Sequence, residues 1–161
     1  MNDKIHIIHI LLVEDNEADV DLTLEMLTSA KFDIKFSVAK DGVEAIDFLT
    51  REENWSQPGL PTLILLDLNL PRRDGRQVLS ILKNHEQLRR IPVIVLSSSD
   101  SEKDVTSCYD LGANCYLVKP SDLQAYRALV RMLEDFWLGI AKLPRCEGHS
   151  IATSSSIGYG H

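Results

Sequence analysis

Five short runs of apolar residues, each followed by a segment with helical patterning, limit the possible folds of this chain more than any other feature. The apolar runs cover residues 7–13, 34–38, 63–66, 92–96 and 115–118, and the helical segments cover 17–30, 42–51, 75–84, 102–111 and about 122–140. Strands that alternate with helices form a parallel sheet with helices on both faces. We therefore predict an α/β domain over residues 4–142, with a doubly wound, five-stranded parallel sheet in the common strand order 2-1-3-4-5.

The pattern within two of the runs indicates where their strands lie. Residues 63–66 are apolar without interruption, which is typical of a central strand covered on both faces. Residues 34–38 alternate apolar and polar side chains, which predicts an edge strand with one wetter face.

Composition and charge disfavour several classes of protein. A formal charge of −7 argues against nucleic acid as a partner, because a phosphate backbone requires a basic face. No apolar stretch approaches the ~18 residues of a membrane span, and the first run lacks the cleavage site of a signal peptide. The three cysteines form no CxxC pair and suit reduced thiols. We therefore expect a cytoplasmic protein with no membrane partner.

Polar residues gather where the predicted strands end. They are Glu14, Asp15, Asp67, Asn69, Ser97 and Lys119. Each alone is typical of a helix cap, a loop or a surface charge, but the carboxyl ends of parallel strands share one edge of the sheet, where ligands bind. In the predicted strand order Glu14, Asp15 and Asp67 meet, and such close carboxylates require a positive charge among them. Mg²⁺ suits a site of few carboxylates that also binds phosphate.

Four segments resemble the signature segments of response-regulator receiver domains in two-component signalling. They are LLVEDNEADV, LLDLNLPRRDG, VIVLSSS and YLVKP, in the order and spacing of that family. The resemblance covers the whole predicted domain and implies a flavodoxin-like receiver fold. One departure is Ser98, where family members most often carry Ala or Gly; it leaves the hydroxyl of Ser97 in place.

The resemblance also implies a role for each candidate site residue. Asp67 would be the phospho-acceptor. Glu14, Asp15 and Asp67 would supply side-chain oxygens to Mg²⁺, and Asn69 its backbone carbonyl. Ser97 and Lys119 would contact the phosphoryl oxygens, and Tyr116 would be the aromatic switch residue. A carboxylate can act as the nucleophile, and phosphoryl transfer needs chiefly positioning and neutralisation of charge.

Two other classes of function remain open from the sequence. A DxN motif after a strand is also found in phosphatases with an aspartate nucleophile, although there it follows the first strand and here it follows the third. The chain is also compatible with a degenerate receiver used as a constitutive binding module, against which the intact acids and Lys119 argue. We expect no enzymatic activity other than self-catalysed phosphoryl transfer and slow autodephosphorylation.

The pattern of the last predicted helix indicates which surface of the domain binds a partner. Residues 143–161 are small and polar, which predicts a disordered tail, so output must come from the receiver surface. Apolar residues cover about half of the helix circumference, more than the ~100° stripe that packing on one side requires. We expect a homodimer with Phe136 and Trp137 at its interface; the alternative is that these residues are buried or simply exposed. The segments DLNLPRRDGRQVL and FWLGIAKLPR resemble single-domain regulators of bacterial and cyanobacterial phytochromes, which implies a phytochrome-type histidine kinase as donor.

Overall fold

The computed structural model describes residues 7–27, 32–51 and 59–144. Most of the predicted tail, residues 145–161, lies outside the described residues. Within them, no helix is long and apolar enough to cross a membrane.

A five-stranded parallel sheet forms the centre of the fold. Its strands are β1 (Ile8–Val13), β2 (Ile34–Ala39), β3 (Leu63–Asp67), β4 (Val93–Ser97) and β5 (Cys115–Val118). All pairs are parallel and the order is β2-β1-β3-β4-β5, as predicted. Every residue of β3 is buried, whereas β2 lies at an edge with a partly exposed face. The uninterrupted and the alternating patterns therefore both predicted the strand positions correctly.

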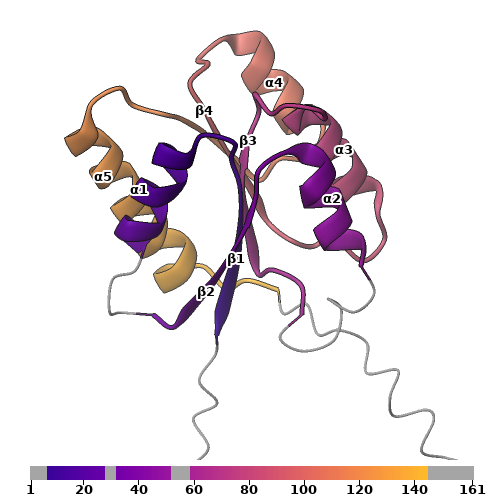
Figure 1. The fold of residues 1–161 in the computed structure, drawn as a ribbon, viewed down its shortest axis with the longest axis horizontal. Coiled ribbons are helices and arrows are strands. Elements are labelled where there is room, and N and C mark those ends of the chain that lie inside the picture. The colour runs from indigo at the N-terminus through magenta and orange to yellow at the C-terminus, as the bar shows by residue number, and fades with distance from the viewer. Residues whose placement is uncertain (1–6, 28–31, 52–58, 145–161) are drawn as a thin grey trace, which may run out of the picture.

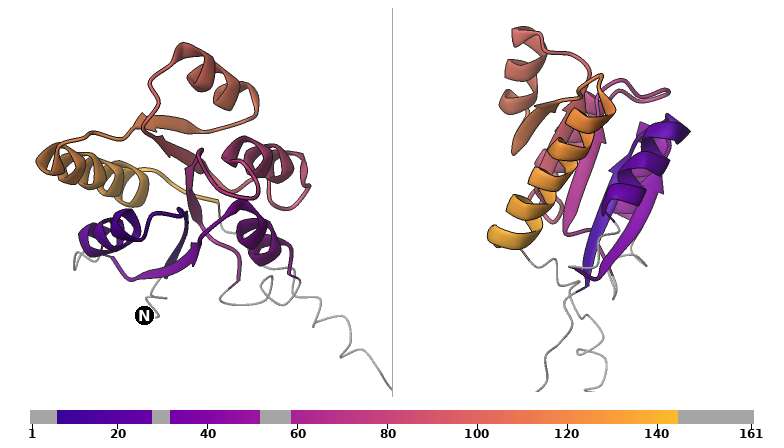
Figure 2. Two further views of the ribbon diagram at one scale, coloured as in Figure 1. Left: turned by 45° about the horizontal axis from the view of Figure 1, so that its top comes forward. Right: turned by 90° about the vertical axis from the view of Figure 1, so that its left-hand side faces the viewer.

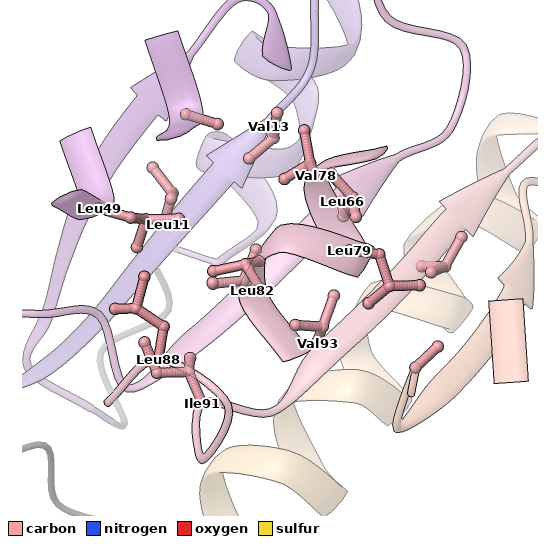
Figure 3. Packing of buried hydrophobic residues seen from close by; sticks show 14 of the residues in the cluster. Leu11, Val13, Leu49, Leu66, Val78, Leu79, Leu82, Leu88, Ile91 and Val93 are labelled. Carbon is pink, nitrogen blue, oxygen red and sulfur yellow. The ribbon is translucent and has the colours of Figure 1, made fainter. Parts of the chain in front are cut away.

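Helices cover both faces of the sheet. They are α1 (Glu17–Leu27), α2 (Gly42–Thr50), α3 (Gly75–Asn84), α4 (Glu102–Asp110) and α5 (Leu123–Leu133). Figure 1 and the left view of Figure 2 place α1 and α5 together on one side of the sheet, with α2 and α3 on the other. Two separate cores result, one for each face of the sheet. Figure 3 shows the first core, in which α2 and α3 pack on alternate residues of the strands, such as Leu11 and Val13; the intervening Ile10 and Leu12 face α1 and α5.

Polar caps begin the helices at the edge of the sheet where the strands end. The side chains of Asp41, Asp74, Ser101 and Asp122 accept hydrogen bonds from backbone N–H groups in the first turns of α2, α3, α4 and α5. These bonds satisfy N–H groups that have no partner within the helix.

The pattern of the last helix predicted one α-helix, but the structure shows an α-helix followed by a π-helix. α5 ends at Leu133 and continues as the π-helix η2 (Glu134–Ile140). Leu133 and Leu138 both contribute to the second core. Five residues turn an α-helix by about 500°, which would separate the two side chains by about 140°, whereas wider π turns bring them to one face. The helical segment does end near residue 140, but its turn width was not predictable from a 3.6-residue period.

Gly75 holds the start of α3 against the end of β3. A Cβ atom there would lie 2.4 Å from the carbonyl oxygen of Asp67 and 2.7 Å from Cα of Leu68. Neither backbone atom moves without displacing Asp67 itself. We expect Gly75→Ala to lower the free energy of unfolding by about 2 kcal/mol, the usual scale of overpacking.

Gly139→Ala is the matched control, because a Cβ atom there meets nothing closer than 3.8 Å. We expect its free energy of unfolding to stay within about 1 kcal/mol of the original protein. Urea denaturation measures both variants. Equal stability of the two would show that the approach of α3 to β3 is not tight.

Candidate functional site

Three carboxylates converge where β1 and β3 end side by side. Val13 pairs with Leu66 in the register of these strands, so the residues that follow each strand lie at one edge of the sheet. The carboxylate oxygens of Glu14, Asp15 and Asp67 come within 4.8 Å of one another. Glu14 and Asp67 are buried and Asp15 is exposed. The structure therefore brings together the three acids that the sequence indicated.

Lys119 supplies the positive charge among these acids. Its ammonium donates to Oε2 of Glu14 at 2.6 Å and to Oδ2 of Asp67 at 3.3 Å. The backbone N–H of Lys119 donates to the carbonyl of Ser97 at 2.7 Å, which fixes the loop after β5 beside the end of β4. The long side chain thus reaches across the edge of the sheet to strands β1 and β3.

The pKa values of Glu14 and Lys119 are both shifted upward, for different reasons. Burial raises the pKa of Glu14 to about 7, and the nearby charge of Asp67 adds to this effect while Lys119 opposes it. Burial alone would lower the pKa of Lys119, but its hydrogen bond to Glu14 and the charges of Asp67 and Glu14 raise it above its ordinary value. The lysine therefore stays charged, and the site carries more negative charge than one ammonium neutralises.

Backbone N–H groups also hold two of the acids in place. The N–H of Asn69 donates to Oδ1 of Asp67 at 3.1 Å, and that of Asn16 donates to Oε1 of Glu14 at 3.2 Å. Oδ2 of Asp67 is the oxygen that meets Lys119. The orientation of the Asp67 carboxylate is thus fixed from both sides.

Ser97 at the end of β4 and Tyr116 of β5 are linked through the loop between β4 and α4. Ser97 is fully buried and its hydroxyl oxygen accepts from the N–H of Ser99 at 3.1 Å. The Tyr116 hydroxyl donates to the carbonyl of Ser99 at 2.7 Å, and its side chain packs partly against the first core. Both side chains therefore depend on the position of one loop.

The same loop is tied to two helices by residues that the sequence did not single out. The hydroxyl of Ser99 donates to Asp104 of α4 at 2.6 Å and lowers the pKa of that carboxyl. Arg76 of α3 pairs with Asp104 and with Asp74. The spacing of these polar residues on the surfaces of two helices gave no signal of the contact.

Phe136 and Trp137 lie in η2, away from the carboxylates. Helix α5 runs from the edge of the sheet where the strands end toward the opposite edge (Figures 1 and 2), and η2 continues it. The two rings meet edge to face with centroids 5.4 Å apart. Half of the Phe136 surface is exposed, whereas Trp137 packs partly against the second core. The two residues therefore differ in how far they are available to a partner.

Comparison with known proteins agrees with this geometry. Residues 10–131 match the response regulator receiver domain family. The chain is 44% identical over 135 residues to response regulator Rcp1 of Synechocystis sp., which covers 84% of this chain and 92% of that protein. It is 38% identical over 135 residues to a probable methanogenesis regulatory protein, FilR2, of Methanothrix harundinacea, which covers 84% and 86%.

Solved structures show the same fold. The Mn²⁺-bound form of Rcp1 matches with a TM-score of 0.78 at 43% identity, over 85% of this chain and 99% of that one. The phosphorylated cyanobacterial phytochrome response regulator RcpA matches with a TM-score of 0.82 at 43% identity, over 87% and 100%. Together with the carboxylate cluster and Lys119, these matches show that the chain belongs to the response-regulator receiver domain family.

Proposed function

We propose that this chain is a phosphorylation switch that accepts a phosphoryl group on Asp67. The main evidence is the position of this carboxylate, between the acids that follow β1 and the ammonium of Lys119. Its oxygen would attack phosphorus, form an acyl phosphate and release the remainder of the donor. The structure of phosphorylated RcpA, a protein 43% identical to this one, supports the proposal.

We infer further that Glu14, Asp15 and Asp67 hold Mg²⁺ with their side chains, directly or through water, and that Asn69 contributes its backbone carbonyl. The donor set fits, because Mg²⁺ prefers oxygen ligands and these carboxylates carry more negative charge than Lys119 neutralises. Rcp1 has been solved with Mn²⁺, and the receiver domain of the kinase PA1611 with magnesium in its active-site cleft. When bound, the ion would neutralise charge on the phosphoryl oxygens.

Ser97 and Lys119 would bind the oxygens of the phosphoryl group. Lys119 already meets Asp67, and its compact ammonium would need only to follow the added oxygens. The hydroxyl of Ser97 would have to leave the N–H of Ser99, and this movement would pull on the loop that Tyr116 holds. Tyr116 would thereby report phosphorylation to the surface of α4, β5 and α5.

The phosphoryl donor in this proposal is a histidine kinase, most specifically the kinase of a phytochrome photoreceptor. RcpA is a phytochrome response regulator, and a bacteriophytochrome response regulator, AtBRR, is also similar, with 39% identity and a TM-score of 0.63. Transfer of radiolabel from purified phytochrome-type kinases to this chain tests the pairing. Histidine kinases draw on ATP, which places the exchange in the cytoplasm.

We regard the chain as a switch and not as a hydrolase. A hydrolase with an aspartate nucleophile releases phosphate over many cycles, whereas a switch retains the acyl phosphate long enough to signal. A steady-state assay with phosphate esters distinguishes them, with no sustained turnover expected if the chain is a switch. The acidic net charge of −7 supports a protein partner and not a nucleic acid.

We also propose that a second copy of this chain covers the exposed stripe of α5 and η2. Met132, Phe136 and Ile140 follow one another at four-residue intervals and are 70%, 50% and 75% exposed. Such a continuous apolar stripe on one helical face is typical of an interface. Trp137 supports Phe136 through the ring contact from its partly buried position.

Truncation of Phe136 tests the dimer. We expect Phe136→Ala to raise the dimer dissociation constant about thirtyfold, because an aromatic anchor commonly contributes about 2 kcal/mol. Combining it with Trp137→Ala should give a monomer that still accepts phosphate. Since Trp137 also packs on the core, the single Phe136 variant is the cleaner measurement.

Leu123→Ala is the control, because Leu123 is also 50% exposed and lies at the other end of α5. Sedimentation over a concentration series measures all variants, and the control should dimerise like the original protein. Unchanged dimerisation of Phe136→Ala, or an equal loss in Leu123→Ala, would refute this interface.

A further inference from the structure

Lys119 has a third carboxylate partner that sequence analysis did not identify. Oδ2 of Asp19 lies 3.5 Å from the Lys119 ammonium, in addition to Glu14 at 2.6 Å and Asp67 at 3.3 Å. An ammonium has three N–H donors, so the three acids match its capacity. The Lys119 side chain is 14% exposed, which leaves little solvent to replace a lost partner.

The three partners are not equivalent. Glu14 and Asp67 also belong to the cluster with Asp15 whose oxygens lie within 4.8 Å of one another, and Asp19 does not. A divalent cation in that cluster would therefore share two of the three acceptors of Lys119 and would repel its ammonium. Asp19 is the partner that the cation leaves untouched.

Asp19 is held in place by its own backbone contacts. Its N–H donates to Oδ1 of Asn16 at 3.1 Å, and its carbonyl accepts from the hydroxyl of Thr23 at 2.7 Å. The Thr23 oxygen also lies 2.7 Å from the hydroxyl of Tyr126 in α5. Because the Thr23 proton is engaged by Asp19, Tyr126 donates to Thr23. The first turns of α1 are thereby fixed to α5, with the Asp19 carboxylate toward Lys119.

We propose that Asp19 is a positioning residue: it keeps a counter-charge on Lys119 when a divalent cation occupies the cluster of Glu14, Asp15 and Asp67. The inference rests on the proposed metal site. As a consequence, the cation does not expel Lys119 from the site. Lys119 remains beside Asp67, where it can bind the phosphoryl oxygens. Asp19 thus lowers the electrostatic cost of having both cations together.

A simpler role for Asp19 gives a different result. An acid in the first turn of a helix interacts favourably with the helix dipole, and its charge would attract any cation nearby. That attraction does not require Lys119. A double-mutant cycle between Asp19 and Lys119 separates the two roles.

The experiment titrates MgCl₂ into the full chain at constant ionic strength, with calorimetry and amide chemical shifts of Asp15 and Asn69 as readouts. Asp19→Asn is made in the original protein and in Lys119→Met. In the original protein we expect Asp19→Asn to weaken Mg²⁺ binding about fivefold, the upper range for a partly exposed ion pair. In Lys119→Met we expect the same substitution to change Mg²⁺ binding by less than about 1.5-fold.

Asp21→Asn is the matched control. Asp21 carries the same charge on the same helix and lines a pocket with Asp15, but it is not among the three acids bound to Lys119. We expect it to change Mg²⁺ binding by less than about 1.5-fold, because an exposed charge is screened by salt.

An equal effect of Asp19→Asn in both backgrounds, or an effect no larger than that of Asp21→Asn, would overturn the positioning role. Absence of saturable Mg²⁺ binding in the original protein would instead overturn the proposed metal site, and the inference with it. Mg²⁺ titration of the unsubstituted protein therefore distinguishes failure of the positioning role from failure of the proposed metal site.

Discussion

Replacing Asp67 with alanine is expected to abolish phosphorylation of this chain. With Mg²⁺ and a labelled donor, the original protein should acquire one phosphate that is stable in acid and labile to alkali or hydroxylamine, as acyl phosphates are. Asp67→Ala removes the carboxylate that contacts Lys119 and lies in the cluster with Glu14 and Asp15. We expect labelling to fall by at least about a hundredfold, because the carboxylate assigned as the nucleophile is lost.

The fold of this variant should survive. Asp67 is buried beside Glu14, so removing one of two neighbouring negative charges relieves repulsion. Asp21→Asn serves as the labelling control because it removes an acid of α1 outside the cluster. Label that persists in folded Asp67→Ala would place the phosphate elsewhere.

The second large effect concerns the metal. Asp15→Ala is expected to weaken Mg²⁺ binding by at least about tenfold, because it removes a charged oxygen ligand and even partners of ligands commonly contribute that much. Ser97→Ala removes a neutral hydroxyl that accepts a hydrogen bond from the N–H of Ser99. We expect it to change Mg²⁺ binding less than about twofold.

Calorimetric titration of the two variants compares them directly. Ser97→Ala should nevertheless slow phosphoryl transfer, because the hydroxyl is assigned to the phosphoryl oxygens and not to the metal. Equal Mg²⁺ affinities of Asp15→Ala and Ser97→Ala would mean that the cation does not bind at the acid pair after β1.

The order of the strands was predicted from the arrangement common to doubly wound sheets, and burial left a direct signature of the places of two strands in the sequence. Residues 63–66 are wholly apolar and lie at the sheet centre, whereas residues 34–38 alternate and lie at its edge. That strand order was enough to predict that Glu14, Asp15 and Asp67 lie close together. These acids follow strands, and the ends of parallel strands are fixed relative to one another by the sheet.

Contacts made by helix residues were not predictable in the same way. Lys119 pairs with Asp19 and Arg76 pairs with Asp104. In each pair a long basic side chain reaches an acid on a helix, and the meeting of the two depends on how whole helices pack. Only the position of Asp19 in the first turn after the acid pair hinted at its place beside the site. The π turns of η2 were likewise hidden, because they arise from packing Leu133 and Leu138 on one core and not from a local preference.

Direct identification of the phosphorylated residue tests the central claim most plainly. The protein is phosphorylated by a small-molecule acyl phosphate with Mg²⁺, reduced with borohydride and analysed by tandem mass spectrometry. Reduction of an aspartyl phosphate converts the side chain to that of homoserine. The account predicts this change at Asp67 alone, and only when Mg²⁺ is present. Modification at another acid, or a phosphate on serine or histidine that survives the reduction, would contradict it.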